Sequence, residues 1–248
     1  MSMFDLKGRR GIITGASSGL GLAMANVLAE AGATVYALSR TGGVKAGEAP
    51  TPANVIHRKI DVCDYKALEE MVKEIGADGL DFLINNAGAT VKCRAEQFAD
   101  DDFERIMKTN VSSVFKLSCL CYPYLKESPH MGRIINIASM SAHLGFNQVV
   151  PYCTSKGAVA AMTRGLAVEW ANDNVTVNSI SPGWFPSEMS KKVMDEERRA
   201  QILARMPVHK FGDPRDIGSM ALFLVSDGAL YVTGQDFAVD GGALAYGF

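Results

Sequence analysis

Short apolar runs rich in β-branched residues alternate with longer amphipathic stretches along this chain, and this alternation constrains the fold more than any other feature. The apolar runs predict strands at Gly11–Thr14, Thr34–Ser39, Val55–Ile60, Asp81–Asn85, Arg133–Ala138, Thr176–Ile180 and Asp236–Val239. The stretches between them predict helices at Leu20–Ala31, Tyr65–Ile75, Phe103–Lys126, Tyr152–Ala171, Glu196–Met206 and Pro214–Ser226. Strands and helices that alternate in this way form a parallel sheet with helices on both faces.

The predicted strands are nearly continuous apolar runs, as expected when both faces of a sheet are covered. No linker or repeat interrupts the pattern, so we expect a single domain over residues 1–248. The stretch Thr41–Pro52 is rich in Gly, Ala and Pro and predicts an exposed loop.

The bulk composition excludes several classes of protein. A formal net charge of -2 gives no reason to expect nucleic acid or an anionic membrane as partner. No run of about 18 apolar residues predicts a membrane span, and the first residues lack the apolar core of a signal peptide. The five cysteines are scattered, which suits reduced thiols in the cytoplasm. Cys119 and Cys121 point to different sides of a helix, so we expect no metal site.

A glycine-rich turn, Thr14-Gly15-Ala-Ser-Ser-Gly19-Leu-Gly21, lies between the first predicted strand and the first helix. Glycines permit a tight turn and close backbone approach, and a helix N-terminus offers free N–H groups to an anion. The spacing Gly-x-x-x-Gly-x-Gly differs from the Gly-x-Gly-x-x-Gly of many dehydrogenases. The context nevertheless predicts that the turn binds a dinucleotide pyrophosphate.

The end of the second strand indicates which dinucleotide binds. An NAD-specific site usually has a carboxylate there to accept the ribose hydroxyls, whereas this chain has Ser39 followed by Arg40. A guanidinium can bind the additional phosphate of NADP through charge-assisted contacts. We therefore predict NADP(H), with NAD(H) as the alternative.

A tyrosine and a lysine one helical turn apart, Tyr152 and Lys156, indicate acid–base chemistry. Positions i and i+4 share a helix face, and a free phenol has a pKa of about 10, too high for a base at neutral pH. A neighbouring cation stabilises the phenolate and lowers that pKa. A shift of about three units takes about 4 kcal/mol, which the Lys156 ammonium and a cationic nicotinamide ring could supply together. Ser139 lies upstream in Ile-Asn-Ile-Ala-Ser.

These motifs together resemble the short-chain dehydrogenase/reductase family. The shared features run in the family's order and spacing over essentially the whole chain: Thr14-Gly-x-x-x-Gly-x-Gly21, Asn85-Asn-Ala-Gly88, Asn110, Ser139, Tyr152-x-x-x-Lys156, Pro182-Gly183 and Val239-Asp-Gly-Gly242. The resemblance implies a doubly wound Rossmann domain with a seven-stranded parallel sheet. It also implies a nicotinamide cofactor held by Gly15, Ser17, Ser18, Leu20, Asp61, Val62, Asn86, Ala87, Gly88, Pro182, Gly183, Phe185 and Ser187, besides Ser39, Arg40, Tyr152 and Lys156.

Within that site the resemblance implies distinct parts. The glycine turn would line the pyrophosphate, Asp61 and Val62 the adenine, and the segment 86–88 the adenosine ribose and the central sheet. Residues 182–187 would pack around the nicotinamide carboxamide, although Ser187 stands where the family has Thr.

The same resemblance implies catalytic roles. Tyr152 would exchange a proton with the carbonyl or hydroxyl group of the substrate, and Ser139 would orient that oxygen. Lys156 would hold the nicotinamide ribose and lower the pKa of Tyr152. Asn110 would help to hold a water chain that carries protons from Lys156 to solvent. The chain is thus expected to be a carbonyl/alcohol oxidoreductase.

Substrate selectivity is expected in loops at the carboxyl ends of the strands, including a substrate lid at about 184–207. The candidate contacts are Lys92, Arg94, His143 and Trp184, and the two cations would suit a carboxylate. Within the family the chain resembles the gluconate 5-dehydrogenase and deoxygluconate 3-dehydrogenase group, which implies a sugar acid, keto sugar or polyol.

Two alternatives stay open. A 3-oxoacyl thioester reductase has the same fold and catalytic residues, and a cofactor-binding regulator without catalysis is the more remote alternative. The resemblance further implies a homodimer built on the helices Val111–Lys126 and Tyr152–Ala171, and a homotetramer through a second contact near the C-terminus.

Overall fold

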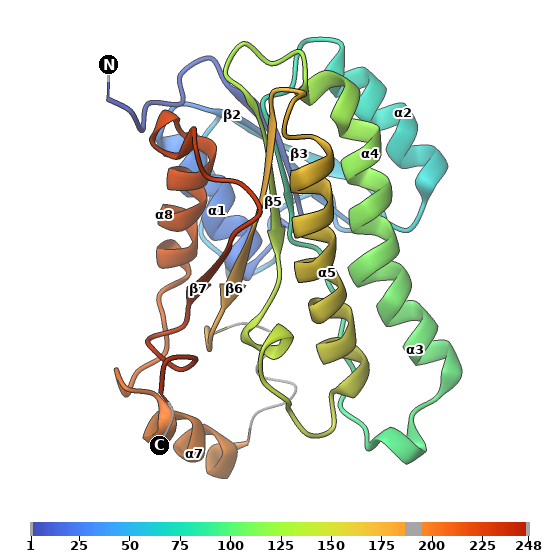
Figure 1. The fold of residues 1–248 in the computed structure, drawn as a ribbon, viewed down its shortest axis with the longest axis vertical. Coiled ribbons are helices and arrows are strands. Elements are labelled where there is room, and N and C mark those ends of the chain that lie inside the picture. The colour runs from blue at the N-terminus through green and yellow to red at the C-terminus, as the bar shows by residue number, and fades with distance from the viewer. Residues whose placement is uncertain (1, 187–194, 247–248) are drawn as a thin grey trace.

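One parallel sheet of seven strands lies at the centre of the molecule, between layers of helices (Figure 1). A computed structural model describes residues 2–186 and 195–246. The sheet order is β3-β2-β1-β4-β5-β6-β7, and every neighbouring pair is parallel. The strands are β1 (Arg10–Thr14), β2 (Thr34–Ser39), β3 (Val55–Lys59), β4 (Phe82–Asn85), β5 (Gly132–Ile137), β6 (Val175–Pro182) and β7 (Asp236–Val239). The predicted α/β fold with a doubly wound, seven-stranded parallel sheet is confirmed, and the predicted strand ends are correct to within two residues.

Helices cover both faces of this sheet (Figure 1). On one face α1 (Gly19–Glu30) packs against α8 (Pro214–Val225). On the other face lie α2 (Tyr65–Gly76), α4 (Ser113–Leu125) and α5 (Val150–Glu169). Farther along the chain, α7 (Glu196–Arg205) lies beyond the carboxyl ends of the strands. No helix in the described ranges is long and apolar enough to cross a membrane.

Adjacent strand residues supply two separate cores, because successive side chains point to opposite faces of a sheet. Ile13 and Ile84 are fully buried in the core under α1 and α8. Their neighbours Ile12 and Leu83 are fully buried in the core under α2, α4 and α5. Burial on both faces explains why the central strands are continuously apolar in sequence.

The helix predicted at Phe103–Lys126 differs from the observed structure. The chain forms α3 (Asp100–Met107), a π-helical segment at Lys108–Ser112 and then α4. Three aspartates open α3, and carboxylates are favourable at a helix N-terminus, so the helix starts earlier than its apolar pattern suggests. The π segment, a feature often found at functional sites, carries Asn110.

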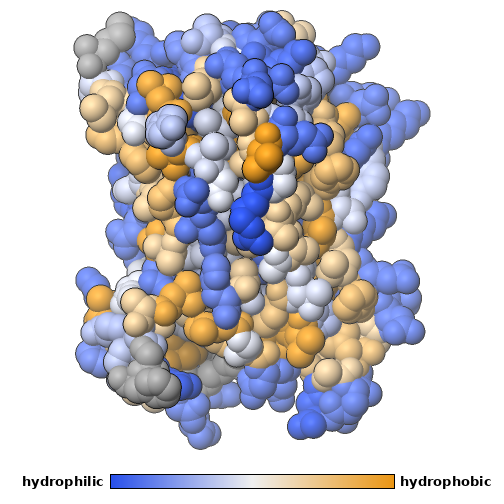
Figure 2. Space-filling model, viewed as in Figure 1, coloured by the Kyte–Doolittle hydropathy of each residue, from blue (hydrophilic) through white to orange (hydrophobic). Residues whose placement is uncertain are grey.

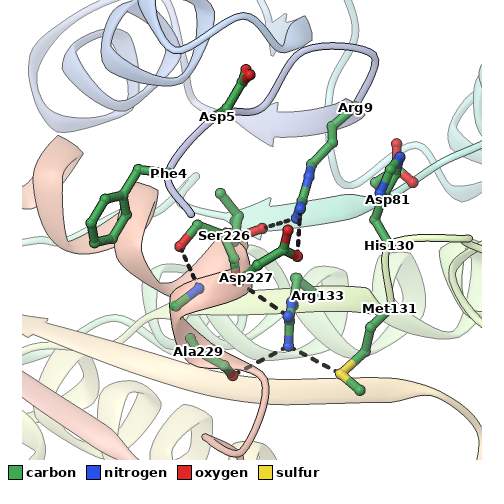
Figure 3. Close-up of polar contacts among 12 residues, drawn as sticks. Phe4, Asp5, Arg9, Asp81, His130, Met131, Arg133, Ser226, Asp227 and Ala229 are labelled. Carbon is green, nitrogen blue, oxygen red and sulfur yellow. Dashed lines mark hydrogen bonds and ion pairs between the residues drawn. The ribbon is translucent and has the colours of Figure 1, made fainter. Parts of the chain in front are cut away.

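Two buried arginines tie the amino-terminal edge of the sheet to the turn after α8 (Figure 3). Arg9 donates to Val225 O at 2.7 Å and pairs with Asp227 at 2.6 Å. Arg133 is 1% exposed and donates to Ser226 O at 3.2 Å and Ala229 O at 3.3 Å. Burial, and then the charge of Arg9, lowers the pKa of Arg133 to about 10, so it stays charged at neutral pH. This structural cluster lies at the edge of the sheet opposite the site described next.

Candidate active site

The glycine turn between β1 and α1 is packed too tightly for side chains. Gly15 has a φ of 68°, and a Cβ there would lie 2.9 Å from Asn86 Nδ2. A Cβ on Gly21 would lie 2.4 Å from Gly15 O. Asn86 Nδ2 donates to Thr14 O at 2.9 Å and Gly15 O at 3.2 Å. Thr14 Oγ1 accepts from the backbone N–H of Asn86 and of Ala87, each at 2.9 Å. These contacts clamp the turn against the end of β4.

The first turn of α1 contains no side chain of its own that would compete with an anion. Ser18 is the N-cap residue but makes no side-chain cap, and the first turn of α1 contains no acidic residue. Ser17 is buried, whereas Ser18 and Leu20 are partly exposed beside the turn. Free N–H groups at the positive end of a helix, above a glycine cradle, suit a dinucleotide pyrophosphate. The residues present therefore fit the group that the sequence predicts here.

The loop 41–52 lies across this turn, although the sequence predicts only that it is exposed. Lys45 N–H donates to Ser17 O at 2.9 Å. Gly19 N–H, at the start of α1, donates to the exposed Glu48 carboxylate at 3.3 Å. A carboxylate of the protein thus contacts the N–H group that a phosphate would use. The sequence pattern gave no signal for this contact, because residues 19 and 48 belong to different structural elements.

A basic pair lies at the carboxyl end of β2. Ser39 is buried and its hydroxyl contacts Thr41 Oγ1 and accepts from Gly42 N, each at 3.1 Å. The next residue, Arg40, is exposed and lines an open pocket of about 670 Å³ together with Lys59. The register of the sheet pairs Ser39 with Lys59. Lys59 is not among the residues predicted from the sequence, although aligning the carboxyl ends of the second and third strands places it beside Ser39.

The predicted adenine residues lie beside this pocket. Asp61 lines it, and its side chain accepts from Cys63 N at 2.8 Å. Val62 is buried in the core under α2. Positively and negatively charged side chains therefore line the pocket together, because Asp64 and Glu74 also border it.

The structure brings Ser139, Tyr152 and Lys156 together at the carboxyl end of β5. Ser139 follows β5, and its hydroxyl makes a hydrogen bond with Tyr152. Lys156 Nζ lies 5.6 Å from the centroid of the Tyr152 ring. The ammonium donates to Ile137 O at 2.6 Å, and the residue is 5% exposed.

Burial shifts both ionisable groups toward their neutral forms. Desolvation raises the pKa of Tyr152, although the hydrogen bond with Ser139 acts in the opposite direction. Desolvation also lowers the pKa of Lys156 to about 8. The direction of the Tyr152 pKa shift set by the protein groups alone is therefore upward, and the lowering expected from Lys156 together with a nicotinamide ring stays a prediction. The arrangement favours the protonated phenol, which is the proton-donating form.

Asn110 joins α5, the helix that carries Tyr152 and Lys156, to the chain after β4. Its amide nitrogen donates to Ala89 O and Ser155 Oγ, each at 2.9 Å, and its oxygen accepts from Ala89 N at 2.7 Å. Ser155 lies between Tyr152 and Lys156 on α5 and donates to Tyr152 O at 2.7 Å. The buried Asn110 side chain thus fixes the helix that carries both residues, while its part in a water chain stays a prediction. A Cβ on Gly88 would lie 3.5 Å from Asn110 Oδ1.

The residues predicted around the carboxamide follow β6, which ends at Pro182. Gly183 N donates to Val239 O at 2.9 Å, and a Cβ on Gly183 would lie 2.6 Å from Asp240 Cα. Phe185 is buried in the core against Gly212. Ser187 lies outside the described residues.

Three of the four predicted substrate residues contact different partners within the protein. Lys92 and Arg94 are both exposed, and Arg94 pairs with Glu96. His143 Nε2 lies 2.6 Å from the Asp236 carboxylate. Trp184 packs edge-on against Phe146 with ring centroids 5.9 Å apart. Their contacts with a substrate stay predictions.

Comparisons with known proteins agree with this geometry. A family model described as enoyl-(acyl carrier protein) reductase matches residues 15–243. The chain is 36% identical to the 2-dehydro-3-deoxy-D-gluconate 5-dehydrogenase of Dickeya dadantii, over 99% of both chains. It is 35% identical to the 3-oxoacyl-(acyl-carrier-protein) reductase of Vibrio cholerae, over 96% of this chain and 98% of that one. Its fold matches the crystal structure of a gluconate 5-dehydrogenase from Burkholderia cenocepacia in complex with NADP and tartrate, with a TM-score of 0.89, 29% identity and 98% of each chain covered.

A doubly wound parallel sheet with a glycine turn, and with Ser, Tyr and Lys side chains gathered at its carboxyl edge, defines an NAD(P)-dependent oxidoreductase acting on alcohols and carbonyls. The chain belongs to the short-chain dehydrogenase/reductase family.

Proposed function

We propose that this enzyme uses NADP(H) to interconvert a carbonyl and a secondary alcohol on a sugar acid, keto sugar or polyol. The observation that carries the substrate class is the full-length similarity to a deoxygluconate dehydrogenase and to a gluconate 5-dehydrogenase crystallised with NADP and tartrate. The basic pair Arg40 and Lys59 beside the buried Ser39 supports NADP(H), since no carboxylate at the end of β2 repels a phosphate.

The chemistry divides between the cofactor and the protein. A bound nicotinamide supplies or accepts the hydride. In reduction the Tyr152 phenol donates its proton to the substrate oxygen, and in oxidation Tyr152 takes the hydroxyl proton. Ser139 donates a hydrogen bond to that oxygen and orients it. Lys156 holds the ribose and, when charged, stabilises the Tyr152 phenolate. Asn110 fixes the position of α5 through Ser155 and so keeps Tyr152 and Lys156 in place at the site. The stretch 184–207, of which residues 187–194 lie outside the described residues, stays the proposed lid over the substrate.

A panel assay tests the function by following nicotinamide absorbance with NADPH and NADH. Keto-gluconates, ketohexoses and polyols are compared with acetoacetyl thioester and simple ketones. We expect turnover on a keto sugar or sugar acid with NADPH. The similarity to a 3-oxoacyl-(acyl-carrier-protein) reductase supports a second candidate, and turnover confined to the thioester would establish it instead. Cofactor binding without turnover on any substrate would favour the non-catalytic alternative.

Removing the Arg40 guanidinium should change cofactor choice. A charge-assisted hydrogen bond contributes about 1.5–3 kcal/mol, so Arg40→Ala should raise the KM for NADPH by about 10- to 100-fold while the KM for NADH stays within about threefold. Lys59→Ala should have a smaller effect in the same direction. The matched control is Arg10→Ala, which removes an exposed guanidinium paired with Asp78 at the opposite edge of the sheet. An equal loss with both cofactors would contradict the proposed phosphate contact.

Glu48 should oppose cofactor binding, because its carboxylate contacts the N–H of Gly19. Glu48→Gln keeps the shape and removes the charge, and an exposed charge interaction of about 1 kcal/mol corresponds to an NADPH Kd about fivefold lower. Titration of cofactor fluorescence measures this Kd directly. Glu30→Gln, at the other end of the same helix, is the control and should leave the Kd unchanged. A weaker affinity in Glu48→Gln would mean that Glu48 assists the cofactor.

The protein is proposed to assemble into oligomers in the cytoplasm. Exposed apolar side chains on α4 and α5, namely Phe115, Val150 and Val168, support a homodimer built on these helices, with a homotetramer formed by a second contact. On the face that includes α5, apolar and hydrophilic side chains are interspersed in the middle, and hydrophilic ones predominate along the margins (Figure 2). The five free cysteines support a cytoplasmic location. Solution scattering tests the assembly, and a monomer would contradict it.

A further inference from the structure

The carboxylate of Asp236, at the start of β7, gathers three hydrogen-bond donors beside the catalytic serine. Ser179 Oγ donates to Oδ1 at 2.7 Å, and Ser181 Oγ donates to Oδ2 at 2.7 Å. His143 Nε2 lies 2.6 Å from the same Oδ2. Because a carboxylate accepts hydrogen bonds, the His143 nitrogen that faces it is the one that carries a proton. The side chains of Asp236 and His143 are 16% and 42% exposed, so the pair links a mostly buried acceptor to the surface.

This pair anchors the far end of the short turn that carries Ser139. The turn is a 3-10 helix, Met140–Ala142, with Ser139 before it and His143 after it. At the near end, Ser139 Oγ accepts from Ser141 N at 3.1 Å, and Ser139 O lies 3.2 Å from Ser181 Oγ. The segment is therefore held to β6 and β7 at both ends. A shift of its far end would rotate the turn and carry the Ser139 hydroxyl with it.

We propose that His143 and Asp236 are positioning residues, which hold the Ser139 hydroxyl where it meets the substrate oxygen. The inference rests on the proposed catalytic role of Ser139. In this proposal His143 acts on Ser139 through Asp236 and the 3-10 turn, and not through the direct substrate contact that the sequence predicts. Loss of one positioned donor costs about 10²–10³-fold in turnover, and a displacement of the donor costs a part of that loss. Removing His143 should therefore lower kcat by about tenfold.

The experiment compares His143→Ala in the wild-type chain and in a Ser139→Ala background. In the wild-type chain we expect kcat to fall about tenfold, with the carbonyl KM and the NADPH Kd within about threefold. In the Ser139→Ala background we expect no further fall, because the residue acts through Ser139. His143→Gln, which retains an N–H donor on a side chain of similar reach, should restore most of the activity. His130→Ala, before the amino end of β5, is the control and should leave kcat unchanged.

Three results would overturn the inference alone. They are an unchanged kcat in His143→Ala, the same tenfold fall in the Ser139→Ala background, and a rise in KM confined to hydroxylated substrates. Asp236→Asn provides an independent check, because it should lower kcat without adding to His143→Ala in the double variant. Full turnover in Ser139→Ala itself would instead overturn the proposed role of Ser139, and the positioning role with it.

Discussion

Tyr152→Phe should lower kcat by about 10²–10⁴-fold, the usual contribution of a positioned general acid or base. The substitution removes only the phenolic oxygen, which makes a hydrogen bond with Ser139. The Lys156 ammonium donates to Ile137 O independently of that oxygen, so the remaining site should keep its geometry. NADPH affinity should stay within about threefold, and the free energy of unfolding should change by about 1 kcal/mol, the net contribution of one hydrogen bond.

Stopped-flow or steady-state kinetics, calorimetric titration with NADPH and thermal unfolding together check this prediction. The matched control is Tyr122→Phe, which removes a phenolic oxygen that donates to Asp173 at 2.8 Å on the side of the molecule away from the site. That variant should retain full activity. Turnover of Tyr152→Phe comparable with the wild type would contradict the mechanism, even if the substrate class is correct.

Lys156→Met should nearly abolish turnover while stabilising the folded protein at neutral pH. The pKa of Lys156 is lowered to about 8 by desolvation, so at pH 7 the fold carries the cost of a buried ammonium. By linkage this cost is on the order of 3 kcal/mol. Methionine has no charge to bury, although Ile137 O loses its donor, so we expect a gain of roughly 1–2 kcal/mol in the free energy of unfolding. Activity should fall about 10²-fold or more.

The pH dependence gives this prediction a definite sign. Between pH about 8 and pH about 10.5 the unfolded chain binds the Lys156 proton more often than the folded chain does, so wild-type stability from this group rises with pH. Below about pH 8 both states are protonated and the full cost is present. The stability advantage of Lys156→Met should therefore be largest below pH 8 and shrink as the pH rises toward 10.5. Urea unfolding at pH 7 and pH 9.5 measures it, and an advantage that grows with pH would contradict the assignment.

Several features of the site were predictable because they depend on residues close together in sequence. The glycine turn, Ser139 after a strand, and the one-turn spacing of Tyr152 and Lys156 are local patterns. The doubly wound sheet was predictable for a related reason. The spacing of apolar residues and the residue composition distinguish a strand from a helix within each short segment. The π segment around Asn110 was not, because its apolar pattern continues that of an ordinary helix.

The sequence by itself determined the sheet and indicated the candidate cofactor turn and candidate catalytic residues, because each is a short-range pattern of residue types. Only the tertiary structure decided which distant residues join them. It brings His143 within hydrogen-bond distance of Asp236, 93 positions away in sequence. It also brings the Glu48 carboxylate to the N–H of Gly19 and pairs Lys59 with Ser39 across neighbouring strands. It also shows that burial raises the pKa of Tyr152, because desolvation depends on how much water the surrounding side chains remove.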